Sequence, residues 1–176
     1  MNHTFPVFKT NRLLLRQFSE GDVDDVYTAL SHPDVIRYYG VRYDSVEGTQ
    51  TQMDWFAELE ATGKGRWWAV CSPDGSMFYG AAGVYHVNEI HRKAEIGFWL
   101  LPAYWGKGIM KEAIPLILDY AFKHFDIHRM EAFVETENRN SKTLLTQLHF
   151  EHEGTMKDCE IKDGNFISLD IYARLK

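Results

Sequence analysis

Cysteine is scarce in this chain of 176 residues, which contains only Cys71 and Cys159. The two lie far apart and neither belongs to a CxxC pair, so the sequence argues against a disulfide framework and against a zinc site. We expect both to be ordinary packed or surface thiols. A cysteine nucleophile is therefore not the chemistry we look for.

Long apolar runs are also missing. No stretch approaches the roughly 18 consecutive apolar residues that a membrane span needs, and the first twelve residues, MNHTFPVFKTNR, contain no apolar export segment. Repeats, low-complexity segments and linkers rich in proline, glycine or serine are absent as well. We expect a cytoplasmic protein with no membrane partner, folded as one domain over residues 1–176 with a core of its own.

Positive charge is not in excess, since the formal net charge is −6. Nucleic-acid phosphates are bound by clustered lysine and arginine, so a nucleic-acid partner is not expected. An anionic ligand would have to be held by local backbone amides and by a few nearby cations, such as Lys107 and Lys111.

The pattern of apolar residues, caps and turn signals predicts a mixed α+β fold. Ser19 starts a helix as its N-cap, Gly63 and Gly65 end another, and Asp163-Gly164 marks a hairpin. We expect a mostly antiparallel sheet of six to seven strands with about four helices. The predicted strands are 12–18, 66–71, 78–87, 93–101, 129–136, 152–159 and 166–174, and the predicted helices are 19–30, 33–39, 44–61, 108–125 and 138–148. The strand–helix–strand unit at 93–136 should form one parallel pair through a right-handed crossover.

The most informative stretch is LLPAYWGKGIMKE at residues 100–112. A strand stops at Pro102, Gly106 and Gly108 follow, and a helical pattern starts at once. Glycines without a Cβ let the backbone approach a ligand, and the N–H groups at a helix start can point at one anion. The stretch therefore predicts a phosphate-binding loop, although glycines that only serve a tight turn into a helix explain it about equally well.

Two common phosphate motifs do not fit this loop. A nucleoside-triphosphate loop needs GxxxxGK followed by serine or threonine, and a dinucleotide fingerprint needs a third glycine where the chain has Lys111. Four stretches resemble instead the GCN5-related N-acetyltransferase (GNAT) superfamily, and within it the ribosomal-protein-alanine N-acetyltransferase type. They are TNRLLLRQF (10–18), AEIGFWLLP (94–102), YWGKGIMKEA (104–113) and ENRNSKTLLTQLHFEHEG (137–154). Trp105 and Met110 depart from the superfamily's general loop pattern, and His149 replaces a frequent glycine.

The resemblance implies acetyl-coenzyme A as co-substrate, without a metal. Its diphosphate would lie on the backbone amides of Trp105, Gly106, Lys107, Gly108, Ile109 and Met110. Its pantetheine arm would run beside the strand that ends at Leu101, in a gap between the splayed parallel strands. An amide near Trp99 or Leu100 would then hydrogen-bond the thioester oxygen.

The expected reaction is direct attack of a neutral amine on the thioester. A carboxylate acting through water is a sufficient base, and Glu95 is the first candidate, with Glu89 and Glu160 behind it; a salt-bridged strand carboxylate is the alternative for Glu95. The match to an Asn-x-x-Ser motif implies that Ser141 protonates the departing thiolate and that Asn138 reaches the pantetheine. Ser141 is otherwise a surface serine, and Asn138 an N-cap.

Aromatic residues suggest where the amine would bind. Tyr38 and Tyr39, together with Arg37, Trp67 and Trp68, would line an acceptor cleft, although aromatic residues at this density more often belong to a core. Histidine pairs such as His149 and His152 lack a metal-binding motif and are taken as solvated.

We therefore expect an N-acetyltransferase that acts in a ternary complex. A peptide N-terminus, possibly that of a ribosomal protein, is the leading acceptor because its α-amine has a pKa of about 8, against about 10.4 for lysine. A polyamine, amino acid or antibiotic acceptor, a non-catalytic acyl-coenzyme A-binding module and, more distantly, a nucleotide-binding protein are the alternatives. The sequence leaves a monomer and a homodimer open.

Overall fold

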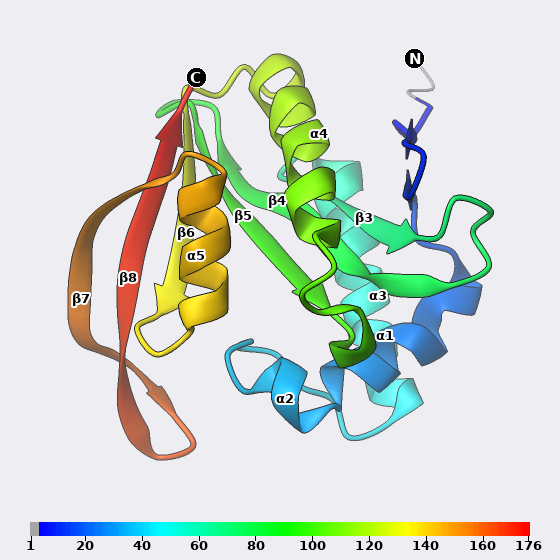
Figure 1. Ribbon diagram of the computed structural model, residues 1–176, viewed down its shortest axis with the longest axis horizontal. Coiled ribbons are helices and arrows are strands. Elements are labelled where there is room, and N and C mark those ends of the chain that lie inside the picture. The colour runs from blue at the N-terminus through cyan, green and yellow to red at the C-terminus, as the bar shows by residue number, and fades with distance from the viewer. Residues whose placement is uncertain (1–3) are drawn as a thin grey trace.

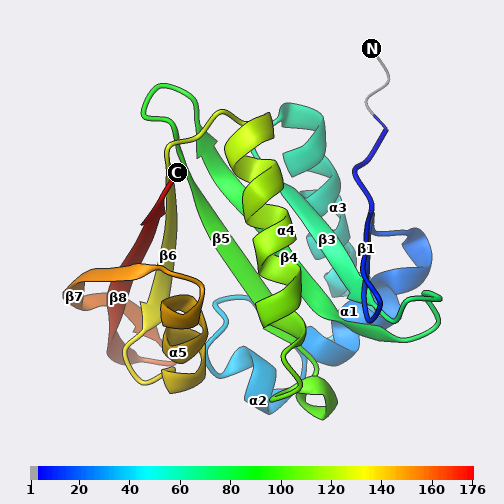
Figure 2. The same cartoon turned by 45° about the horizontal axis from the view of Figure 1, so that its top comes forward.

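The computed structural model describes residues 4–176 and contains one eight-stranded sheet in the order β1-β2-β3-β4-β5-β6-β8-β7 (Figures 1 and 2). The strands are β1 (Phe8–Lys9), β2 (Leu14–Arg16), β3 (Arg66–Cys71), β4 (Phe78–Asn88), β5 (Lys93–Leu100), β6 (Arg129–Glu135), β7 (Glu151–Lys162) and β8 (Asn165–Leu175). The helices are α1 (Val23–Leu30), α2 (Pro33–Ile36), α3 (Val46–Thr62), α4 (Ile109–His124) and α5 (Arg139–Gln147), with short 3-10 turns at Glu20–Asp22 and Pro102–Tyr104. The α+β fold expected from the sequence is confirmed.

Helices cover both faces of the sheet. Helix α4 crosses one face, and α1 and α3 lie against the other (Figures 1 and 2). Two cores result. One centres on Ile114, Ile117 and Met130 beneath α4, and the other on Phe56 and Trp67 beneath α3. Strands β3, β4 and β5 contribute residues to both cores from their two faces, as the period of two requires.

The sheet has one parallel pair among the described strands, formed by β5 and β6. Their pairing covers only three positions, from Lys93 opposite Arg129 to Glu95 opposite Glu131. Beyond Glu95 the two strands separate toward the end of β5 (Figure 1). This divergence was expected, and it leaves the free edge of β5 open beside the loop that follows it.

The sheet contains one strand more than the seven predicted ranges, whereas the five helices among residues 4–176 correspond to the five predicted helical ranges, one more than the approximate count of four. The additional strand is β1, whose two residues pair with β2 through Phe8 opposite Leu15. A strand this short shows no alternation in the sequence, so only its packing reveals it. The side chain of Phe8 packs near Trp68, at a ring-centroid distance of 5.8 Å.

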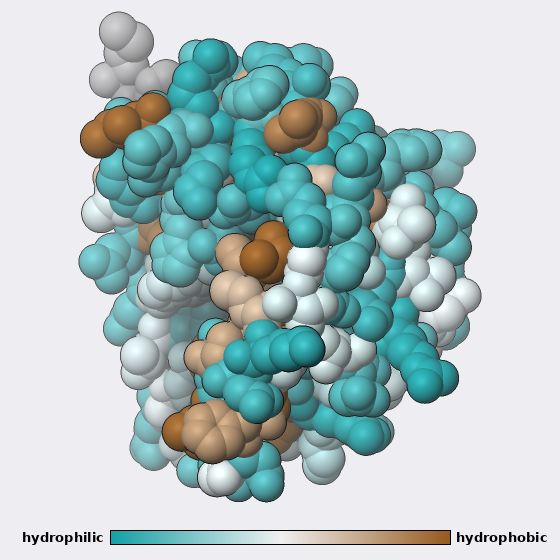
Figure 3. All heavy atoms as spheres, turned by 90° about the vertical axis from the view of Figure 1, so that its left-hand side faces the viewer, coloured by the Kyte–Doolittle hydropathy of each residue, from teal (hydrophilic) through white to brown (hydrophobic). Residues whose placement is uncertain are grey.

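The last two strands form a long hairpin at the edge of the sheet. Viewed from that side, the surface is mainly hydrophilic with separate apolar spots (Figure 3). Near the turn, Ile161 and Phe166 face each other across the strands and are 68% and 67% exposed. Within residues 4–176, no helix is long and apolar enough to cross a membrane.

Candidate active site

The loop before α4 has the geometry of an anion site. Gly106 and Gly108 both adopt left-handed backbone conformations, with φ of 71° and 74°, and Gly108 is the N-cap residue of α4. A Cβ built on either glycine would meet nothing within 4 Å. The glycines are therefore required by the turn itself, and the space beside them is open to a ligand.

The backbone N–H groups of this loop have no protein acceptor. Across residues 4–176, none of the N–H groups from Gly106 to Lys111 donates to a carbonyl or side chain of the chain itself. The run is bounded by Trp105, whose N–H donates to Pro102 O at 3.1 Å, and by Glu112, whose N–H donates to Gly108 O at 3.2 Å. Consecutive free donors at a helix N-terminus fit a diphosphate, whereas the amide of Trp105, which the motif included, is already used.

Two residues near the N-terminus, Thr10 and Arg12, hold this loop and the first turn of α4 in place. Arg12 donates from Nη2 to Lys107 O at 2.7 Å, and its Nη1 lies 3.4 Å from the carboxylate of Glu112. Thr10 also donates to Glu112, at 2.5 Å. Because the carbonyl of Lys107 is turned toward Arg12, the loop is fixed while its donors stay free. The roles of Thr10 and Arg12 did not follow from sequence reasoning, although both belong to the stretch TNRLLLRQF.

A cavity of about 730 Å³ opens beside the loop, a size typical of small-molecule sites. It brings together most of the residues selected from the sequence. Its lining includes Tyr38, Tyr39, Trp99, Leu100, Trp105, Gly106, Gly108, Ile109, Met110, Asn138 and Ser141. Lining residues that sequence reasoning did not select include Asp34, Phe98, Tyr104, Glu137 and Arg139.

The edge of β5 supplies further donors. The carbonyl of Trp99 lies against Gly80 of β4, and the N–H of Leu101 donates to Tyr79 O at 2.9 Å. Since backbone groups alternate in direction along a strand, the N–H groups of Phe98 and Leu100 point toward the gap left by β6. Of the two residues expected to bind the thioester, Leu100 thus presents its amide to the gap, and Trp99 does not.

Helix α5 forms the other wall. Asn138 is its N-cap, and its side-chain oxygen accepts from the N–H of Ser141 at 3.2 Å. Ser141 is half-buried and borders the cavity. Next to it, Lys142 donates to Asp170 of β8 at 3.0 Å, which ties the helix to the sheet. The capping role of Asn138, the alternative weighed from the sequence, is what the structure shows.

Asp170 is a buried carboxylate with three hydrogen-bond partners. Burial alone would raise its pKa, but hydrogen bonds from Thr155, Lys142 and His152 outweigh that effect and lower the pKa below its usual value. The distances are 2.5 Å to Thr155, 3.0 Å to Lys142 and 3.2 Å to His152. The position of α5, and of Ser141 with it, therefore depends on an ionised Asp170.

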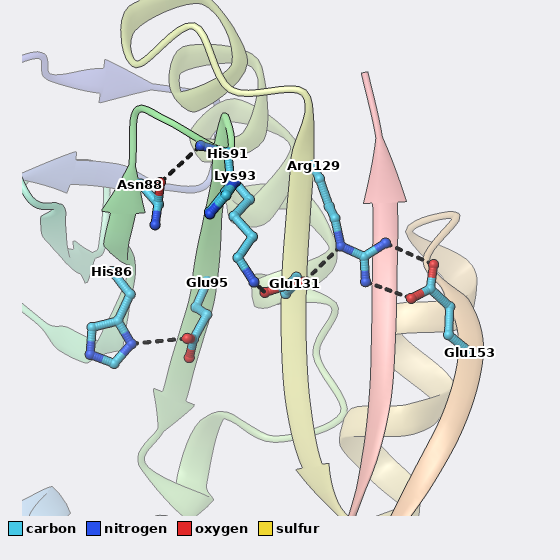
Figure 4. A network of polar contacts seen from close by, with 8 residues as sticks. All are labelled: His86, Asn88, His91, Lys93, Glu95, Arg129, Glu131 and Glu153. Carbon is cyan, nitrogen blue, oxygen red and sulfur yellow. Dashed lines mark hydrogen bonds and ion pairs between the residues drawn. The ribbon is translucent and has the colours of Figure 1, made fainter.

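Glu95 lies outside the cavity, at the last paired position of β5 before the strands diverge. Its carboxylate contacts His86 Nδ1 at 2.9 Å (Figure 4). Of the other two carboxylates considered, Glu89 lies 3.6 Å from Lys64 on the exposed turn after β4, and Glu160 is exposed on β7. The contact with His86 was not predicted.

The aromatic residues divide between the cavity and the core. Tyr38 and Tyr39 follow α2 and line the cavity, and burial raises the pKa of the Tyr39 phenol despite the opposing effect of Trp99. Trp67 is 3% exposed, packs against Tyr85 and Phe56, and does not border the cavity. The structure thus places Trp67 beneath α3, in the core against which Tyr39 packs, and outside the cavity.

No group of three or more histidine, cysteine or acidic side chains in residues 4–176 is arranged to hold a metal ion. His152, one of the histidines considered, instead lies beside Asp170.

A sheet whose parallel strands part beside a loop of free amide donors is the architecture of an acetyl-coenzyme A-dependent N-acetyltransferase. Residues 12–151 match the family model described as acetyltransferase (GNAT) domain, and the chain belongs to this family. It is 30% identical over 173 residues to the uncharacterized N-acetyltransferase YoaA of Bacillus subtilis (strain 168), with 98% of each chain covered.

Solved structures share the fold. One is RimL, a ribosomal L7/L12 alpha-N-protein acetyltransferase in complex with coenzyme A, with a TM-score of 0.85 and 21% identity over 97% of this chain and 98% of that one. Another is spermidine N-acetyltransferase from Vibrio cholerae in complex with coenzyme A and spermine, with a TM-score of 0.82 and 22% identity over 94% and 96% of the two chains.

Proposed function

We propose that this N-acetyltransferase acetylates the N-terminal α-amine of a protein or peptide, such as a ribosomal protein, by direct attack within a ternary complex. The observation that carries the proposal is the extent of the cavity. It reaches from the amide donors at Gly106 and Gly108 to Tyr38 and Tyr39 after α2. One continuous cavity can hold acyl donor and amine together, so no acetylated enzyme intermediate is needed.

Acetyl-coenzyme A supplies the activated acetyl group. We assign the diphosphate to the free N–H groups of Gly106 to Lys111 and the pantetheine arm to the open edge of β5. The N–H of Leu100 or Phe98 would then donate to the thioester oxygen, where negative charge develops during attack. Lys107 and Lys111 add positive charge close to the diphosphate.

In the proposed reaction the lone pair of the neutral amine forms the N–C bond and the C–S bond breaks. The thiolate leaves with the electron pair, and Ser141 gives it a proton and regains one from solvent. The proton lost by the amine passes through water to Glu95. A distance of three residues along β5 separates Glu95 from Phe98, about 10 Å at the rise of a strand, which is why the path includes water.

The charges around the cavity favour a peptide over a polyamine. On the side of α2 and α5 the lining carries both signs, with Asp34 and Glu137 beside Arg37 and Arg139. A polyamine has several positive charges and is best matched by a predominantly acidic lining, whereas a peptide offers a cationic terminus and neutral or anionic groups beyond it. An α-amine is also more often neutral than an alkyl amine at pH 7.

An acceptor screen tests the proposal. Purified protein is mixed with acetyl-coenzyme A, and free thiol is measured with ribosomal N-terminal peptides, the same peptides blocked at the α-amine, spermidine, and free amino acids. We expect thiol release with free peptide termini and none with the blocked peptides, even where these contain lysine. Turnover with spermidine alone would assign the cavity to polyamines, and no release with any amine would contradict the proposal.

A further inference from the structure

Glu95 has a position in the sheet that sets it apart from the other carboxylates. It forms the last parallel pair with Glu131, directly before β5 and β6 separate. Glu131 is 7% exposed and is held by Lys93 at 2.9 Å and by Arg129 at 2.7 Å (Figure 4). These two cations neutralise the charge of Glu131. Burial alone would raise its pKa, but the hydrogen bonds from both cations lower it. Glu95 contacts neither cation.

The partner of Glu95 is His86, which lies at an irregularity in the pairing of β4 with β5. The register between β4 and β5 shifts between Tyr85 and Asn88, and His86 has a φ of 52°. A left-handed backbone is uncommon for a residue with a side chain. As a result His86 points along the sheet at Glu95, with Nδ1 2.9 Å from the carboxylate, while 69% of its side chain is exposed. The imidazole thus lies between the carboxylate of Glu95, whose side chain is 22% exposed, and solvent.

Other groups around this pair are few. Tyr85 lies beside Glu95, and burial together with that carboxylate raises the pKa of the phenol, so Tyr85 holds its proton at neutral pH. Lys93 on β5 and Glu131 on β6 are paired with each other. The negative charge of Glu160, on strand β7 of the hairpin, also raises the pKa of Tyr85. Of these groups, only His86 has an imidazole, which can accept a proton on one ring nitrogen and donate one from the other.

We propose that His86 is the proton-relay residue of this enzyme, receiving from Glu95 the proton lost by the acceptor amine and releasing it to bulk water. The inference rests on the proposed function, in which Glu95 is the base. The amine proton moves through water to the Glu95 carboxylate, Glu95 gives it to Nδ1 of the neutral imidazole, and the imidazolium gives one proton to solvent. Each turnover thereby restores an ionised Glu95 and a neutral His86.

The test compares kcat against pH for the wild type and H86N. Asparagine tolerates a left-handed backbone and can donate from its amide to Glu95, but it cannot carry a proton. We expect H86N to lower kcat about 10- to 100-fold at pH 8, below the roughly 100- to 10,000-fold typical of a general acid or base that touches the substrate, because His86 acts through Glu95. The ratio of the two rates should change with pH, because an imidazole can gain and lose a proton whereas the amide of asparagine cannot. Comparing both proteins with the same amine cancels the titration of the amine itself.

Three further measurements complete the design. Coenzyme A affinity by calorimetry should be the same in H86N and wild type within about twofold, since neither residue borders the cavity. H91N is the matched control, because His91 is exposed on the turn that follows β4 and, among residues 4–176, its backbone N–H donates to Asn88 while its side chain makes no hydrogen bond; its kcat should not change. The double variant H86N/E95Q should be no slower than E95Q, as expected for two residues on one path.

The outcomes are distinguishable. A rate ratio that stays constant across pH, or an H86N enzyme as fast as the wild type, overturns the relay and leaves the proposed function standing. A wild-type protein that releases no thiol with any amine overturns both.

Discussion

The indole Nε1 of Trp105 donates to the carbonyl of Leu100 at 2.8 Å, which fastens the loop at residues 105–108 to the end of β5. The same strand end is assigned to the thioester and the loop to the diphosphate, so this hydrogen bond sets the distance between the two halves of the cofactor site. Trp105 is 43% exposed, and its effect should therefore be on binding more than on folding.

Replacing Trp105 with phenylalanine tests this connection. The W105F side chain keeps the aromatic surface but has no donor for Leu100 O. Losing one hydrogen bond of about 0.5–1.5 kcal/mol should weaken coenzyme A binding about 2- to 12-fold. Calorimetry with coenzyme A measures the change. An unaltered affinity would show that the loop keeps its position without Trp105.

Gly108 should be sensitive for two separate reasons. An alanine there must adopt a φ of 74° and places its Cβ in the open space beside the free amides. We expect G108A to lower the free energy of unfolding by about 1 kcal/mol and to weaken coenzyme A binding about tenfold or more, the equivalent of about 1.4 kcal/mol.

Gly164 provides the matched control for Gly108. It has a φ of 80°, has open space around it and lies in the β7–β8 turn, far along the chain from the loop. G164A should show a similar loss of stability in urea unfolding with an unchanged coenzyme A affinity. Equal binding losses in both variants would mean that backbone strain, and not the site, accounts for the effect.

Variants of Ser141 and Asn138 should distinguish a role in catalysis from a role in capping helix α5. S141A should lower kcat about tenfold, less than the roughly 100- to 10,000-fold typical of general acid–base catalysis because a thiolate is already a fairly good leaving group, with little change in coenzyme A affinity. N138A removes the N-cap of α5 and should cost about 1 kcal/mol of stability. Steady-state kinetics and thermal unfolding of both variants distinguish the roles. A large loss of coenzyme A binding in S141A would contradict its assignment.

Asp170 should make stability depend on pH. Because its folded-state pKa is lowered, its contribution is present above about pH 4, the ordinary range of an aspartate, and is lost as the pH falls through the folded-state pKa. D170N should therefore cost about 2–4 kcal/mol at pH 7, since it breaks a buried ion pair with Lys142, and the difference from wild type should shrink in strong acid.

Urea unfolding at several pH values measures the dependence on Asp170. Asp119 supplies the control, because it is 77% exposed in an i,i+4 pair with Lys123. D119N should change stability by less than about 0.5 kcal/mol. A D170N deficit that is as large at pH 2 as at pH 7 would show that packing, and not the ionised carboxylate, is responsible.

Much of the fold could be predicted because local signals agree with the tertiary structure. The bounds of β3 were predicted at residues 66–71 as observed, and Ser19, Gly63 and the Asp163-Gly164 turn act where their residue types indicate. The glycine turn at Gly106 and Gly108 before α4 was also predicted from the sequence, since glycines before a helix leave a recognisable pattern; that this loop binds a diphosphate stays a prediction. His149 has a φ of 64°, in the left-handed region that favours glycine, which explains why glycine is frequent at this position in the superfamily.

The remaining features depend on contacts between distant segments. The alternation of a strand places Trp67 and Trp68 on opposite faces of β3, but that both faces are covered by cores depends on helices from elsewhere in the chain. The bond from Arg12 to Lys107 joins residues 95 positions apart. The meeting of His86 and Glu95 needs a register shift in β4 that no residue pattern indicates. Such relationships follow from the assembled sheet and cannot be predicted from local propensity.

The most direct test of the central claim is a crystal structure of the protein with coenzyme A. The account predicts diphosphate oxygens within about 3.2 Å of several backbone nitrogens between Gly106 and Lys111, with the pantetheine arm along β5. A diphosphate bound elsewhere, with these nitrogens turned to the protein's own carbonyls, would contradict it.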